Sequence, residues 1–136
     1  MAGTVICNMG ITTALTNAVQ TAVGGLGQRQ ALTIQAAFTY VASAATTVDA
    51  YVQTTLNGGI TWFDVANFHF TTASATKYQN VNGDTAVNAS ATLTAQTLTN
   101  DTSINGFLGD QLRVVITSVG TYGPGTQLRI DIFGRG

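Results

Sequence analysis

Hydrophobic and polar residues alternate with a period of two through several stretches of this chain, a pattern typical of half-buried β-strands. The cleanest alternation spans residues 31–41, where Thr33, Gln35 and Thr39 lie on the polar face. The apolar face of that stretch collects Leu32, Ile34, Ala36, Phe38 and Tyr40. Further strands are predicted over residues 48–56, 60–70, 77–81, 87–93, 112–116 and 128–132.

Residues 48–70 carry the strongest local signal, because two β-branched and aromatic runs flank Asn57-Gly58-Gly59. Glycine reaches the positive φ angles of a tight reversal, so the stretch predicts a β-hairpin. A three-residue loop with Gly59 in the left-handed conformation sets Thr54 opposite Trp62 and Val48 opposite Phe68. A two-residue Asn57-Gly58 turn is the alternative, and it requires a bulge to return Phe68 to the core.

The preferred register places most apolar residues of this hairpin on one face and leaves Asp64 as the exception among them. That face consists of Val48, Ala50, Val52, Leu56, Ile60, Trp62, Phe68 and Phe70. Residues 112–132 predict a second hairpin, whose turn through residues 120–125 holds Pro124, the only proline. Residues 11–23 are ambiguous between helix and strand, and their threonine content favours strand.

Together these elements predict an all-β protein, an antiparallel β-sandwich or jelly-roll-like fold with about seven or eight strands. Residues 1–10 are small and partly apolar, and they predict a short N-terminal arm that a partner would order. Residues 11–136 then form a single β-sandwich domain.

Charged residues are scarce in this chain, which indicates a protein that associates with other proteins. Charged residues make up 8% of the 136 residues, against roughly 25% in a typical soluble domain, and the formal net charge is −1. Little electrostatic repulsion opposes contact between copies, so a homo-oligomer that packs against other proteins is expected.

The same composition argues against several classes of partner. The five Lys and Arg residues are scattered, so nucleic acid is not an expected partner. No apolar run approaches the roughly 20 residues of a membrane helix, and the N-terminus lacks the pattern of a secretory signal. Cys7 is the only cysteine, which excludes an internal disulfide.

Candidate chemistry is sparse, and the sequence predicts neither an enzyme nor a bound cofactor or metal. His69 has no candidate partner nearby in sequence. Asp49 and Asp64 fall on opposite faces in the preferred register, so paired-carboxylate hydrolysis lacks its geometry. Asp101 and Asp110 flank a polar loop that could hold calcium, although local turn hydrogen bonds are the ordinary role of such residues.

The candidate interface residues lie on the faces that point away from the predicted core. Tyr51, Phe63 and Val65 project from the non-core face of the first hairpin, where an exposed aromatic patch would mark a binding surface. Protein contact, stacking on sugars and cover by a second layer remain open for this patch. Arg113 and Arg129 point outward in the last hairpin, where a cross-strand pair with Asp131 is possible.

A short motif in the first hairpin, Thr55-x-Asn57-x-Gly59-x-Thr61-Trp62, resembles a single Asp-box of sialidase-like propellers, with Asn in place of Asp. The box marks a type of hairpin and not an activity. A propeller needs repeated blades, and this chain has one box and no internal period, so a propeller is not predicted.

Over about its last two-thirds, the chain resembles the small β-sandwich virion proteins of tailed bacteriophages. The resemblance rests on the short arm, the stretch YVQTTLNGGITWFDVANF and the ending DTSINGFLGDQLRVVITSVGTYGPGTQLRIDIFGRG. It implies a capsid decoration or cement protein that binds the major capsid protein in a virion assembled in the host cytoplasm.

Two alternatives remain open within this interpretation. One is a tail or head-tail connector component. The other is a carbohydrate-binding module of a receptor-binding apparatus, which would use Tyr51, Phe63 and Trp62 as its stacking surface.

Overall fold

The computed structural model describes residues 3–25, 30–41, 45–87, 90 and 92–135, which form eight β-strands in two antiparallel sheets. The first sheet has the order β1 (Thr4–Gly10), β8 (Gln127–Arg135), β3 (Ala31–Thr39) and β6 (Ala75–Asn82). The second has the order β2 (Ala18–Val19), β7 (Gln111–Gly120), β4 (Ala45–Thr55) and β5 (Phe63–Phe70). The predicted all-β sandwich is confirmed.

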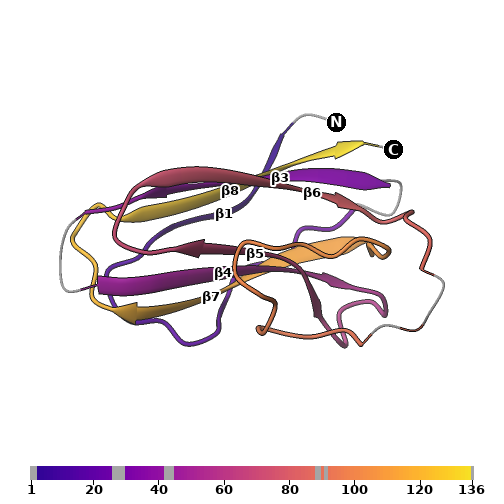
Figure 1. The fold of residues 1–136 in the computed structure, drawn as a ribbon, viewed down its shortest axis with the longest axis horizontal. Helices are drawn as coiled ribbons and strands as arrows, with labels where there is room; N and C mark the ends of the chain where they lie inside the picture. Colours follow the sequence, from indigo (N-terminus) through magenta and orange to yellow (C-terminus); the bar gives the residue numbers. More distant parts are fainter. Residues whose placement is uncertain (1–2, 26–29, 42–44, 88–89, 91, 136) are drawn as a thin grey trace.

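The strands pair in a nested way along the chain. β4 pairs with β5, β3 with β6, β2 with β7 and β1 with β8, all antiparallel. The two halves of the chain therefore run together as one long hairpin, which is folded over so that its pairs alternate between the layers in Figure 1. This order, in two sheets of four strands, is the jelly roll.

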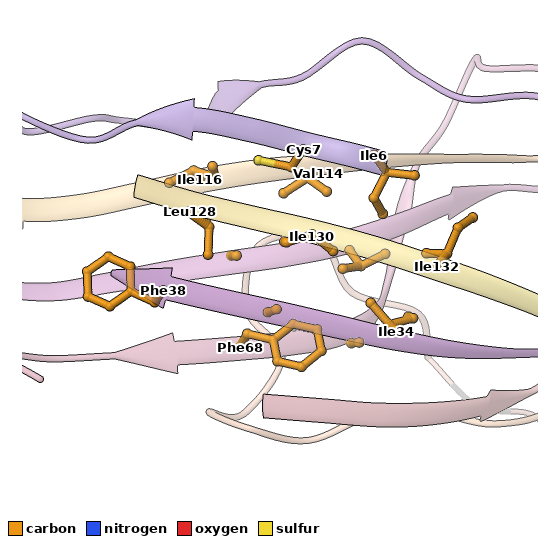
Figure 2. Packing of buried hydrophobic residues seen from close by; sticks show 14 of the residues in the cluster. Ile6, Cys7, Ile34, Phe38, Phe68, Val114, Ile116, Leu128, Ile130 and Ile132 are labelled. Carbon is orange, nitrogen blue, oxygen red and sulfur yellow. The ribbon is translucent and has the colours of Figure 1, made fainter. Parts of the chain in front are cut away.

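The core lies between the two sheets and is built from the alternating apolar faces (Figure 2). The predicted apolar face of β3 is confirmed, since Leu32, Ile34 and Ala36 are fully buried and Phe38 almost so. β7 and β8 contribute the inward side chains predicted for them, which are Leu112, Val114, Ile116, Leu128, Ile130 and Ile132.

The first hairpin exists, but both predicted registers are wrong. Val48 lies opposite Phe70 and Ala50 opposite Phe68, and a bulge follows between Val52 and Gln53. The strands stop at Thr55 and Phe63, so a loop of residues 56–62 joins them. Leu56 and Ile60, expected on the core face, belong to this loop and are 55% and 84% exposed.

The loop is wide because its own polar side chains organise it. The hydroxyl of Thr55 accepts a hydrogen bond from the Gly59 N–H (2.9 Å), and the Asn57 amide oxygen accepts one from the Thr61 N–H (2.9 Å). The indole N–H of Trp62 donates to the Gly59 carbonyl at 3.1 Å. Gly59 has a φ of 98°, so its predicted left-handed conformation is confirmed.

The predicted last hairpin is wrong in its pairing, although its two strands are present. β7 belongs to the second sheet and β8 to the first, so the connection crosses from one layer to the other. Tyr122 in this connection is buried, and its hydroxyl donates to the Thr71 carbonyl at 3.3 Å. Apolar and polar residues alternate in the same way in two strands of a hairpin and in two strands that face each other across a core. The sequence pattern alone therefore could not distinguish a hairpin from a crossing between the sheets.

The predicted arm is wrong for Thr4–Gly10, which form β1 beside β8. Its apolar residues Ile6 and Cys7 are buried in the core, and burial raises the pKa of the Cys7 thiol to about 11. The strand expected over residues 11–23 is reduced to Ala18–Val19 and an isolated bridge from Val23.

The strand expected over residues 87–93 does not form at Val87, Ser90, Thr92 or Leu93. Asn88, Ala89 and Ala91 lie outside the described residues.

Gly109 provides a test of the packing between β4 and the segment that precedes β7. A Cβ at this position would lie 1.7 Å from the Thr55 carbonyl oxygen. Gly109→Ala should therefore lower the free energy of unfolding by about 2–3 kcal/mol, measured by urea denaturation. Gly24→Ala is the matched control, because its Cβ would meet only the Gln111 side chain at 3.8 Å. Equal stability of the two variants would contradict this packing.

Candidate functional site

One side of the sandwich is closed by residues 94–106, which run along the edge strand of each sheet (Figure 1). Against β5, the Asn67 N–H donates to the Thr102 carbonyl (2.9 Å) and the Ile104 N–H donates to the Val65 carbonyl (2.8 Å). This segment, called the edge clamp below, therefore satisfies backbone groups that the second sheet would otherwise leave unpaired.

The edge clamp also holds the edge strand of the first sheet. The Gly106 N–H donates to the Asn82 carbonyl at 2.9 Å, and the Asn82 N–H donates to the Asn105 side-chain oxygen at 2.8 Å. The ammonium group of Lys77 on β6 lies 3.0 Å from the Asp101 carboxylate. A single polar segment thus links the two sheets.

The carboxylate of Asp64 anchors the start of this clamp. It is fully buried and accepts hydrogen bonds from the backbone N–H groups of Gln96 (2.9 Å), Thr97 (3.0 Å) and Leu98 (3.1 Å). The Gln53 side-chain amide donates to it at 2.9 Å. This role was not predicted from the sequence, where its one signal is a single charged residue in an otherwise apolar run.

Arg113, a predicted interface residue, belongs to the same network. Its Nε donates to the Gln53 side-chain oxygen at 3.0 Å, and its guanidinium carbon lies 4.5 Å from the centroid of the Trp62 ring, within cation–π distance. Burial lowers the pKa of Arg113. The guanidinium therefore bridges β7 to the loop of the first hairpin and covers one face of the indole.

The predicted exposed patch of Tyr51, Phe63 and Val65 is not brought together. Val65 is the extra residue of the bulge on β5 and is fully buried in the core, while Tyr51 and Phe63 are half-buried. Burial and the nearby carboxylates of Asp49 and Asp64 raise the pKa of Tyr51. The register predicted from the sequence placed Val65 outward because it lacked the bulge.

Asp49 and Asp64 lie on the same outward face, so the expectation of opposite faces is wrong. The bulge turns Asp64 outward, and Tyr51 lies between the two carboxylates along β4. His69 also has a partner that its sequence position did not reveal, because its Nδ1 lies 2.8 Å from the Asp49 carboxylate. The Asn67 amide donates to the same carboxylate oxygen at 3.4 Å.

This polar cluster shows more structural than catalytic features. The His69 N–H donates to the Asp101 carboxylate at 3.0 Å, and the Asp101 N–H donates to the Asn67 side-chain oxygen at 3.0 Å, which joins β5 to the edge clamp. Within the described part of the chain, no three His, Cys, Asp or Glu residues are grouped to hold a metal ion.

The outward face of the first sheet has a different character. One row across it runs Val5, Asp131, Gln35 and Tyr78, and Phe133 lies one pleat along β8 from Asp131. Val5, Tyr78 and Phe133 are 41%, 70% and 47% exposed. This surface is called the first-sheet face below.

Two charged residues on the first-sheet face, Arg129 and Asp131, neutralise each other. The Arg129 Nε lies 3.1 Å from the Asp131 carboxylate, two residues along the same strand. Arg113 lies on β7 in the other sheet, so the cross-strand pair suggested between the last two strands does not form, and Asp131 pairs instead with Arg129 on its own strand. Low charge with exposed Tyr and Phe is the composition found at the centre of protein interfaces.

The chain matches no protein-family model, no curated protein and no solved structure. Across the ranges described above, no helix is long and apolar enough to cross a membrane.

The anchoring role of Asp64 predicts a large and local effect of its removal. Asp64→Ala leaves three backbone N–H groups and the Gln53 amide without an acceptor, and each unsatisfied group costs about 1–3 kcal/mol. We expect the free energy of unfolding to fall by about 3 kcal/mol or more, and amide hydrogen exchange to accelerate first at residues 96–98.

Asp84→Ala serves as the control for Asp64→Ala, since Asp84 is exposed and no described residue bonds its carboxylate. A stable Asp64→Ala protein with slow exchange at residues 96–98 would show that the carboxylate is not the anchor.

Proposed function

We propose that this chain is a non-enzymatic structural protein of a tailed-bacteriophage virion, a decoration or cement protein that binds the capsid exterior and bridges neighbouring subunits. The observation that carries the proposal is the first-sheet face, where Val5, Tyr78 and Phe133 are exposed and Arg129 and Asp131 form an ion pair. Such a face can lie against another protein without leaving a charge buried and unpaired.

The contacts required by this role are modest in strength. An ordinary specific interface buries about 800 Å² on each partner, which is the scale of one face of a small four-stranded sheet. A cement protein binds a repeating lattice, so many weak contacts act together and raise the overall affinity by multivalency. Neither a deep pocket nor a strong single site is needed.

The fold supports the proposal by analogy. Jelly rolls occur in viral capsid proteins, and also in lectins and cupins. Because one fold hosts many functions, the topology favours a virion role only together with the surface that carries the contact.

The carbohydrate alternative has weaker support at the residues first suggested for it. The guanidinium of Arg113 occupies one face of the Trp62 ring, while Phe63 and Tyr51 are half-buried on separate strands. A sugar-binding platform needs aromatic rings with an accessible face. Trp62, Phe63 and Tyr51 are less accessible than Tyr78 on the first-sheet face.

Location in the particle distinguishes the capsid version of the proposal from the tail version. Gold-labelled antibodies raised against the purified protein should decorate the heads of phage particles that carry its gene, seen by negative-stain electron microscopy. Label confined to the tail or the neck would assign the protein to a tail or connector role. Purified particles that contain none of the protein by mass spectrometry would contradict a virion function.

The contact surface can be tested on particles stripped of the protein. Tyr78→Ala with Phe133→Ala should raise the Kd for the stripped particle by roughly 30-fold or more, since exposed aromatic residues at an interface centre each contribute on the order of 1–2 kcal/mol. Ile60→Ala is the control, because Ile60 is more exposed than either residue but lies at the tip of the first hairpin. Unchanged binding of the double variant would exclude the first-sheet face as the contact.

A further inference from the structure

The edge of β1 is the one long strand edge for which the described residues provide no cover. The edge clamp covers β5 and bonds the end of β6 at Asn82, β6 also carries the charged Lys77, and β2 has only two residues. β1 has seven residues with neither a charge nor a proline, and its described strand partner is β8 alone. An uncharged edge of this length is a template for another strand.

A groove lies beside this edge, between the two layers of the sandwich. It measures about 280 Å³ and is lined by residues 5–8 of the first sheet and by Gln20, Thr21 and Val23. Residues 20–23 belong to the second layer, because the Gln20 N–H donates to the Val114 carbonyl and Val23 pairs with Leu112 on β7. A strand added to β1 would place its inward side chains over this groove.

We propose that the added strand is β1 of a second copy of this chain, paired antiparallel around a two-fold axis. The groove rim and the edge carry no charge, so two identical edges approach without repulsion. In an isologous contact the same strand of both copies pairs with itself in the antiparallel direction. Its outward residues must then lie opposite outward residues of the second copy, and its inward residues opposite inward ones. β1 meets this condition in one register.

The faces of β1 are set by its bulge. Val5 and Asn8 point outward, Ile6 and Cys7 are both buried, and Met9 packs against the core. Thr4 shares the inward face of Ile132, which lies opposite it on β8. Reversal about the midpoint of Ile6 and Cys7 therefore sets outward residues opposite outward ones.

In that register Val5 lies opposite Asn8 of the second copy, Ile6 opposite Cys7, and Thr4 opposite Met9. A shift by one residue would set the outward Val5 opposite the inward Met9, which a continuous pleated sheet does not allow. In the symmetric register the two grooves, each lined by Ile6 and Cys7 of its own chain, lie side by side on the inward side of the joined sheet.

The dimer joins the two first sheets into one sheet of eight strands. Both first-sheet faces then lie on the same side, so the surface that exposes Val5, Tyr78 and Phe133 is doubled in area. The inference does not depend on the proposed function, since an edge-paired dimer would form in the absence of a capsid.

The test uses the purified full chain and measures its mass by sedimentation equilibrium over a range of concentrations. The 14.1 kDa chain should associate to twice its mass. Val5→Lys with Asn8→Lys sets lysine opposite lysine at two symmetric positions, and should raise the dimer Kd at least about tenfold. Val5→Lys with Asn8→Asp sets opposite charges in the same places and should restore the dimer.

Two further measurements make the result specific. Thr76→Lys with Tyr78→Lys adds the same charge to the other edge strand of the first sheet, β6, and should leave the dimer intact. Circular dichroism melting checks that each variant is folded before its mass is interpreted.

A wild-type chain that stays monomeric up to about 100 μM, where a Kd of that order would be detected, overturns the proposal. So does a dimer that survives Val5→Lys with Asn8→Lys, or one that the Asn8→Asp partner variant fails to restore. A dimer with the predicted charge pattern that does not bind phage particles would support this inference while contradicting the proposed function.

Discussion

The pairing of β4 with β5 is the constraint on which the rest of this jelly roll depends. Among the described strands it is the one pair joined by a short loop, and every other nested pair encloses it in sequence. Because β4 also pairs with β7, a slip in the hairpin would turn over the faces that both neighbours match. The bulge beside Gln53 completes the arrangement, since it turns Val65 into the core and Asp64 outward to the edge clamp.

Charge is scarce in this chain, so its sheet edges are protected mainly by a covering segment and only at Lys77 by a lysine on an edge strand. Many proteins place lysine on an edge strand to prevent unwanted pairing. Here the edge clamp uses backbone hydrogen bonds and the side chains of Asp64, Asn67 and Asn105 to occupy the edges of β5 and β6. β1 has no such covering segment among the described residues, so its backbone edge is exposed while the edge of β5 is covered.

The sequence was informative about which segments are strands and which of their side chains face inward. Residues 31–39 and 112–116 alternate because every second side chain is buried in one core, and this alternation can be read from the sequence of each segment alone. Strand partners were less predictable, because β7 and β8 face each other across the core with the same alternation as a hairpin. The register of the first hairpin depended on hydrogen bonds from Thr55 and Asn57, and the role of Asp64 depended on a loop more than thirty residues away.

The nested pairing has a consequence for how the chain reaches its native state. β1 begins near the start of the chain and finds its partner in β8 near the end, where Thr4 lies opposite Ile132. Sandwiches dominated by such distant pairings fold in roughly milliseconds to seconds. During synthesis β1 leaves the ribosome long before β8 is made, so this uncharged edge strand has no partner until β8 emerges.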